Sequence, residues 1–167
     1  MLVRNHKDSD IPEIAKLYYN TVHIVNSKDY TPEQIQAWAS SKSQNEQFWQ
    51  KRFQNYSVYV VEAEEKVIGF AEFEATGHID CFYVHHLWQN KGVGSKLMKH
   101  IEIEAKKQGI LKLFAEVSVT AKPFFKKMGF NAIKEQEKLY ENLKFKQFLM
   151  EKNLSIAEHL ADQEQNI

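Results

Sequence analysis

The chain has 167 residues, of which 43% are hydrophobic, and its 22 lysines and arginines balance 22 aspartates and glutamates. A chain of this length buries roughly 70% of its extended surface, so we expect one domain with a substantial core. Because no net positive charge attracts a polyanion, we expect no nucleic-acid partner. The single cysteine excludes an internal disulfide framework and any multi-cysteine metal site, and we expect no metal cofactor.

The N-terminus carries no basic and apolar signal, and no apolar run approaches the length of a membrane span. We therefore expect a cytoplasmic protein that does not associate with membranes. A homodimer is compatible with the sequence.

The first third of the chain predicts a strand and three helices. Residues 2–6 form a strand if another strand pairs with them. Residues 8–25 begin with capping residues and a proline, and their apolar side chains then recur at helical spacing. Residues 31–38 open with a capping box and a first-turn proline, which predicts a second helix. Residues 44–53 predict a third.

Three strands and a long helix follow. Residues 57–63 and 67–73 are rich in β-formers and flank a polar turn, which predicts a hairpin. Residues 78–85 predict the next strand. From residue 92 to 108, apolar side chains recur on one helical face, and Gly109 ends the helix.

Residues 111–117 predict a strand that returns beside the strand of residues 78–85. A strand-helix-strand connection of this length implies a parallel, right-handed crossover. A short helix then runs from Thr120 to Gly129, and residues 130–139 and 144–152 predict an antiparallel pair. The predicted fold class is therefore α/β, with a mixed sheet of the α+β kind.

We expect the domain to occupy residues 1–152, with residues 153–167 forming a C-terminal tail. The tail contains a capping box, Ser155-x-x-Glu158, and few apolar residues. It predicts a short, weakly docked helix or disorder.

The segment Trp88-Gln-Asn-Lys-Gly-Val-Gly-Ser95 turns from a strand into a helix through two glycines. Backbone N–H groups in the first helical turn lack intrahelical partners, and the helix dipole favours an anion beside them. A Cβ at Gly92 or Gly94 would block a positive φ or the close approach of phosphate oxygens. This corner predicts a phosphate site, although a Gly-x-Gly pair also occurs in ordinary tight turns.

Two segments together resemble the GNAT superfamily of N-acetyltransferases. Gln89-x-x-Gly92-x-Gly94, between Phe82-Tyr-Val-His85 and Ser95-Lys-Leu-Met98, is similar to its pyrophosphate-binding segment. Ala121-Lys-Pro-Phe-Phe-Lys-Lys-Met-Gly-Phe130 resembles the helix, turn and strand that follow the family's fifth strand. The run His78-Ile-Asp-Cys-Phe-Tyr-Val-His85 is similar to a YafP-like bacterial subgroup.

The resemblance implies a GNAT-like acyl-CoA N-acyltransferase fold with the element order β-α-α-β-β-β-α-β-α-β-β. It implies acetyl-CoA as cosubstrate and an enzyme that moves the acetyl group to a primary amine of a small molecule or peptide. The implied reaction is direct attack in a ternary complex. The alternative function is a non-catalytic acyl-CoA-binding sensor or interaction module.

The resemblance also implies which residues bind the cofactor. They belong to the strand before the glycine corner, the corner itself and the short helix near residue 125: Phe82, Tyr83, Val84, Gln89, Asn90, Lys91, Gly92, Val93, Gly94, Ser95, Lys96, Phe124 and Phe125. A solvated, lysine-rich helix face is the alternative role for the lysines.

His78 is the predicted catalytic base. Counted back from Val84, it falls where many family members carry a catalytic carboxylate, and an imidazole pKa of about 6.5 suits proton abstraction near neutral pH. Strand alternation would place Asp80 on the same face, where it could orient His78 or act through water. A structural hydrogen bond is the alternative role for either residue.

The family's usual general acid is a tyrosine in the second motif, and this chain has Phe125 there. Phenylalanine donates no proton, so Ser118, Tyr83 or a water is the predicted substitute, with Ser118 taken as a catalytic residue. Alternation turns Cys81 away from His78, which argues against an acyl-cysteine route.

Tyr30 and Trp38 are the predicted substrate-binding residues. They belong to an aromatic-rich segment that, in the resembled family, lies over the acceptor end of the cleft. Core packing is the alternative explanation for these aromatic side chains.

Overall fold

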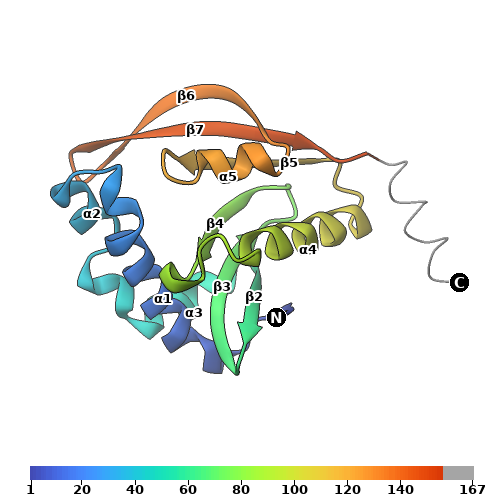
Figure 1. The fold of residues 1–167 in the computed structure, drawn as a ribbon, viewed down its shortest axis with the longest axis horizontal. Helices are drawn as coiled ribbons and strands as arrows, with labels where there is room; N and C mark the ends of the chain where they lie inside the picture. Colours follow the sequence, from blue (N-terminus) through green and yellow to red (C-terminus); the bar gives the residue numbers. More distant parts are fainter. Residues whose placement is uncertain (156–167) are drawn as a thin grey trace, which may run out of the picture.

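The computed structural model describes residues 1–155 as strands and helices (Figure 1). The strands are β1 (Leu2–Asn5), β2 (Ser57–Ala63), β3 (Lys66–Phe73), β4 (Ile79–Val84), β5 (Lys112–Ser118), β6 (Asn131–Tyr140) and β7 (Leu143–Asn153). The helices are α1 (Ile11–Ile24), α2 (Pro32–Trp38), α3 (Glu46–Phe53), α4 (Val93–Lys107) and α5 (Lys122–Lys127). The mixed α/β fold class is confirmed. Three helices separate β1 from β2, one more than in the family order.

The strands form two antiparallel groups rather than one continuous sheet. One has the order β1-β2-β3-β4 and the other β5-β7-β6. Among residues 1–155, a single parallel bridge, between His78 and Phe114, joins them. The predicted parallel direction of β4 and β5 is confirmed, but the expectation of one mixed sheet is wrong, because the two strands separate after this bridge (Figure 1).

A β-bulge interrupts the pairing of β4 with β3. Phe73 pairs with Ile79 and Ala71 pairs with Phe82, so three steps along β4 match two along β3. A bulge of this kind changes which face the intervening side chains occupy. Simple strand alternation therefore fails at Asp80 and Cys81.

Helices cover both faces of the β1-β2-β3-β4 sheet and pack against it through apolar side chains. On one face, α1 and α3 pack against β2 and β3. On the other face, α4 contributes a stripe that is fully buried and was predicted from its spacing: Leu97, Met98, Ile101 and Ala105. The same cluster includes side chains of β5 and α5, so α4 contacts both strand groups. Among residues 1–155, no helix is long and apolar enough to cross a membrane. The predicted tail helix begins at Ser155, and its remainder lies outside the described residues.

We expect Gly77→Ala to lower the free energy of unfolding by more than the cost of backbone strain alone. Gly77 has φ +91°, and an added Cβ would lie 2.2 Å from the Lys112 carbonyl oxygen. Gly109→Ala is the matched control, since Gly109 has φ +71° with no atom within 4 Å of the added Cβ. A left-handed alanine costs about 1–2 kcal/mol, and overpacking at position 77 should add roughly 1–3 kcal/mol. Urea unfolding measures the free energy of unfolding of both variants. Equal losses for the two variants would contradict the packing of this turn against β5.

Candidate active site

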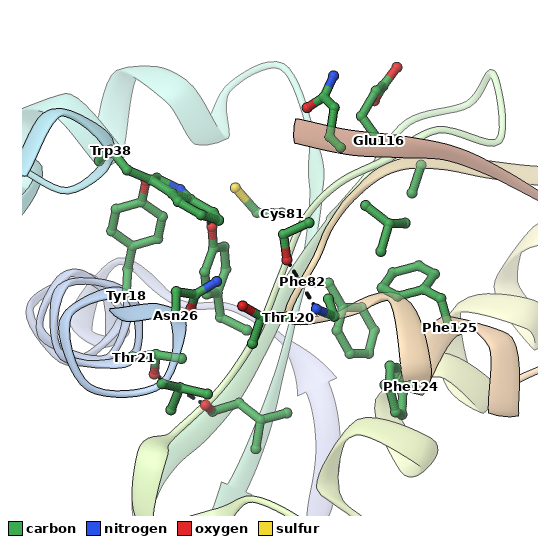
Figure 2. Close-up of a pocket in the computed structure, with 18 of the residues that line it drawn as sticks. Tyr18, Thr21, Asn26, Trp38, Cys81, Phe82, Glu116, Thr120, Phe124 and Phe125 are labelled. Atoms are coloured by element: carbon green, nitrogen blue, oxygen red, sulfur yellow. Dashed lines mark hydrogen bonds between the residues drawn. The ribbon is translucent and has the colours of Figure 1, made fainter. Parts of the chain in front are cut away.

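The gap between β4 and β5 opens into a cavity of about 1170 Å³. Trp38 and Tyr18 lie on one side of the cavity, and Phe124 and Phe125 of α5 lie on the other (Figure 2). Residues from the loop before α4 and from the β6–β7 hairpin complete the lining. The cavity therefore has an end near the glycine corner and another near the aromatic side chains of α1 and α2.

The N-terminus of α4 presents unpaired donors at the edge of this cavity. Gly92 is the N-cap at φ +80°, and no side chain of residues 1–155 caps the helix. The first helical donor is the Lys96 N–H, which bonds the Gly92 carbonyl at 3.0 Å. The N–H groups of Val93, Gly94 and Ser95 therefore have no helical acceptor, and all three residues line the cavity. The arrangement suits an anion.

The backbone of β4 also faces the gap. The His85 N–H donates to the Ile68 carbonyl at 2.9 Å. Because hydrogen-bonded and non-bonded residues alternate in an antiparallel pair, every second residue of β4, counted from His85, bonds to β3. The antiparallel pattern turns the backbone groups of Phe82 and Val84 away from β3. The Val84 carbonyl already accepts hydrogen bonds from the Thr21 hydroxyl at 3.1 Å and the Gln89 amide at 2.6 Å. Phe82 is therefore the position whose backbone is best placed to bind a ligand.

Most of the predicted cofactor residues are brought together. Eleven of them line the cavity: Phe82, Tyr83, Val84, Gln89, Asn90, Gly92, Val93, Gly94, Ser95, Phe124 and Phe125. Lys91 and Lys96 are not in its lining. The Lys91 ammonium lies 5.2 Å from the centroid of the Trp88 ring, and the Lys96 ammonium donates to the Met1 carbonyl at 2.5 Å.

The predicted substrate-binding residues lie side by side at the other end. The Tyr30 and Trp38 rings meet edge to face with centroids 5.1 Å apart, and both line the cavity. The Tyr30 hydroxyl donates to the Lys146 carbonyl at 2.9 Å and accepts from the Val119 N–H at 3.0 Å. The Trp38 N–H donates to the Tyr83 hydroxyl at 3.2 Å. These bonds hold the aromatic wall in position.

His78 does not line the cavity, although it was the predicted base. Its Nδ1 lies 2.5 Å from a Glu74 oxygen and its Nε2 lies 2.6 Å from a Glu116 oxygen. Burial opposes protonation of the imidazole, but the hydrogen bonds to Glu116 and Glu74 outweigh it and raise the pKa above 6.5. This position does not support direct proton abstraction by His78, because both ring nitrogens are occupied.

Asp80 lines the cavity but does not pair with His78. The bulge in β4 directs its carboxylate to α3, where it accepts hydrogen bonds from Arg52 and, at 3.0 Å, from the Tyr56 hydroxyl. Arg52 also holds the fully buried Glu72 through two hydrogen bonds of 2.7 and 2.6 Å. The structure therefore does not show the predicted His78–Asp80 pair.

Ser118, Phe125 and Cys81 also line the cavity. The Ser118 hydroxyl accepts a hydrogen bond from the Ala121 N–H at 3.1 Å, which leaves its proton available to a ligand. Phe125 is buried against Phe82 and Phe124. Burial raises the pKa of the Cys81 thiol well above its usual range, which disfavours a thiolate nucleophile.

Sequence reasoning did not identify Glu116, although it lines the cavity. The sequence of β5 did contain a signal for Glu116. Leu113, Ala115 and Val117 of β5 are buried, so the residues between them occupy the opposite face together with Ser118. The contact between Glu116 and His78 joins residues 38 positions apart and depends on how β4 and β5 meet.

The comparisons with known proteins agree with this geometry. The model of the acetyltransferase (GNAT) domain family matches residues 26–154. Over 134 residues the chain is 29% identical to the uncharacterized N-acetyltransferase YafP of Escherichia coli K12, covering 80% of this chain and 83% of that protein. The GCN5-related N-acetyltransferase structure from Rhodopseudomonas palustris has a TM-score of 0.86 and 26% identity, covering 92% of this chain and 95% of that one. The PaiA N-acetyltransferase of Thermoplasma acidophilum, solved with coenzyme A, has a TM-score of 0.72 and 22% identity, covering 92% and 99%.

These matches define the class as an acyltransferase. The chain belongs to the GNAT family of acetyltransferases, as the resemblance predicted.

We expect the contribution of His78 to stability to depend on pH. Its folded pKa is raised above 6.5, so the contribution is complete below about pH 6.5 and is lost as pH rises through the folded value. The difference in unfolding free energy between the unaltered chain and His78→Gln should therefore be largest in mildly acidic solution and decrease toward alkaline pH. Urea unfolding at several pH values measures it. A difference that stays constant with pH would contradict a charged imidazole between Glu74 and Glu116.

Proposed function

We propose that the chain transfers an acetyl group from acetyl-CoA to a primary amine of a small molecule or peptide, by direct attack in a ternary complex. The observation that carries the proposal is the uncapped N-terminus of α4 at the edge of the cavity between β4 and β5. Because helix N-termini with free N–H groups bind phosphates, this corner suits the diphosphate of a coenzyme A thioester.

The residues present fit such a ligand along the length of the cavity. The N–H groups of Val93, Gly94 and Ser95 would hold the diphosphate, where the helix dipole also favours negative charge. The ring atoms of Phe124 lie 3.0 Å from where a Cβ on Gly94 would stand, so a larger residue at position 94 would fill this corner. The Phe82 and Phe124 rings, 5.3 Å apart, offer an apolar surface to the thioester arm.

The chemistry supplied by this chain is polarisation of a carbonyl and protonation of a leaving group. The Phe82 N–H is directed into the gap, where a preorganised donor to a developing oxyanion contributes roughly 3 kcal/mol. Ser118 can donate its hydroxyl proton to the departing sulfur, in the role that Phe125 cannot fill. The Asp80 carboxylate lines the same cavity, where the Arg52 guanidinium and the Tyr56 hydroxyl hold it in position.

The direct test combines binding with turnover. Calorimetry should detect acetyl-CoA binding, and incubation with small amines, polyamines, amino acids and peptides should release free coenzyme A thiol with at least one acceptor. Binding without thiol release across the panel would contradict acetyl transfer to an amine, and absence of binding would contradict the proposed ligand.

We expect Gly94→Val to weaken acetyl-CoA binding about tenfold or more. The added side chain would contact the Phe124 ring and cover the N–H groups at the start of α4, and loss of one or two charge-assisted hydrogen bonds corresponds to roughly 1.5–3 kcal/mol each. Calorimetry gives the dissociation constant. Ala132→Val, at an exposed position of β6, is the matched control and should leave it unchanged. An unaltered dissociation constant in a folded Gly94→Val variant would exclude this corner as the diphosphate site.

A further inference from the structure

We propose that Asn26 binds an amide group of the acceptor, so that the chain acetylates peptide-like amines such as amino acid amides. This inference rests on the proposed acetyl transfer and narrows the class of acceptor that the same cavity takes. Asn26 determines which amine binds and takes no part in proton transfer.

Asn26 is a buried polar residue whose side chain has no protein partner. Only 5% of the residue is exposed, it lines the cavity, and Figure 2 shows its side chain directed toward the interior. Within residues 1–155 its side-chain amide makes no hydrogen bond. Buried amides are almost always hydrogen-bonded, because the bonds to water that they lose on folding must be replaced. An unpaired amide on the wall of a cavity therefore points to a ligand.

The backbone around Asn26 is fixed by hydrogen bonds. Asn26 begins the short 3-10 helix η2 (Asn26–Lys28), and its carbonyl accepts the Asp29 N–H at 3.0 Å. The Asp29 carboxylate accepts a hydrogen bond of 2.7 Å from the Thr120 hydroxyl, which connects this turn to the segment between β5 and α5. The side chain therefore projects from a backbone that is held in place before a ligand binds, and such preorganisation lowers the entropic cost of binding.

Other polar groups that line this part of the cavity already have partners. The Thr21 hydroxyl donates to a backbone carbonyl at 3.1 Å, and the Tyr30 hydroxyl both donates and accepts a hydrogen bond. The Trp38 N–H donates to a tyrosine hydroxyl at 3.2 Å. These groups hold the protein together, whereas the Asn26 amide is available to a ligand.

The chemistry of the Asn26 side chain indicates the class of ligand group. A carboxamide offers N–H donors and a carbonyl acceptor, which match the carbonyl and the N–H of another amide. A carboxylate placed against this buried neutral group would lose its hydration without gaining a charged partner there. The lysines that line the cavity are all exposed: Lys28, Lys42, Lys127, Lys138 and Lys146. A neutral amide is therefore the group that fits Asn26.

The test compares two acceptors of the same shape, alaninamide and the alkylamine in which an isopropyl group replaces its amide. Asn26→Leu keeps the volume of the side chain and removes its hydrogen-bonding groups. It should lower kcat/KM for alaninamide about tenfold and change that for the alkylamine by less than about twofold. The dissociation constant of acetyl-CoA should stay the same. Because each acceptor is compared with itself, the different basicities of the two amines cancel.

Asn131→Leu is the matched control, because Asn131 is exposed on β6 and does not line the cavity. It should leave both rates unchanged. Equal losses for the two acceptors in Asn26→Leu would overturn the proposal, as would an unchanged rate with alaninamide. A loss of acetyl-CoA binding that accounts for the lower rate would assign the Asn26 amide to the cosubstrate and overturn it too. So would a larger loss with alanine, which carries a carboxylate, than with alaninamide.

A second readout does not depend on turnover. Replacing an unpaired buried amide by an apolar side chain of similar volume removes no protein hydrogen bond, so Asn26→Leu should not lower the free energy of unfolding in urea. A clear loss of stability would show that the amide supports the fold and would overturn its role in binding.

The unaltered chain separates this inference from the proposed function. Thiol release with other amines but none with alaninamide would overturn the inference alone. A chain that binds acetyl-CoA but acetylates no amine would contradict the proposed function itself.

Discussion

The separation of β4 from β5 is the constraint on which the rest of the structure depends. The strands meet at one bridge, His78 with Phe114, and the Gly77 carbonyl accepts the Phe114 N–H at 3.0 Å beside it. Beyond this point, within the described part of the chain, β4 pairs only with β3 and β5 only with β7. Backbone groups of β4 therefore face a cavity, and an exposed strand edge of this kind can bind an extended ligand through main-chain hydrogen bonds.

Two clusters of polar side chains near the bridge connect neighbouring elements. His78 and Glu116 connect β4 to β5, and Arg52 connects α3 to β3 and β4 through Glu72 and Asp80. In either cluster, burying a charge without a partner would cost free energy. The cavity therefore contains carboxylates on both of its walls, and their different partners give them different chemistry. Asp80 faces a permanent cation, whereas Glu116 faces a group that titrates.

Local patterns predicted much of the fold and the backbone turn at the glycine corner. The buried stripe of α4, the strand boundaries and the helix start at Gly92 depend on periodicity and backbone conformation, which neighbouring residues determine. The prediction that Tyr30 and Trp38 bind substrate came from a family resemblance rather than from spacing, and both residues line the cavity. What the sequence could not predict depends on tertiary register. The bulge at Asp80 changed the face of that side chain, and the pairing of His78 with Glu116 required the positions of two strands that are not neighbours over most of their length.

A crystal structure of the chain with coenzyme A would test the central claim most directly. The account predicts diphosphate oxygens within hydrogen-bond distance of the N–H groups of Val93, Gly94 and Ser95, and the pantetheine arm between β4 and β5 beside the Phe82 backbone. Coenzyme A bound elsewhere, or β4 and β5 closed into continuous pairing with the ligand outside them, would contradict it.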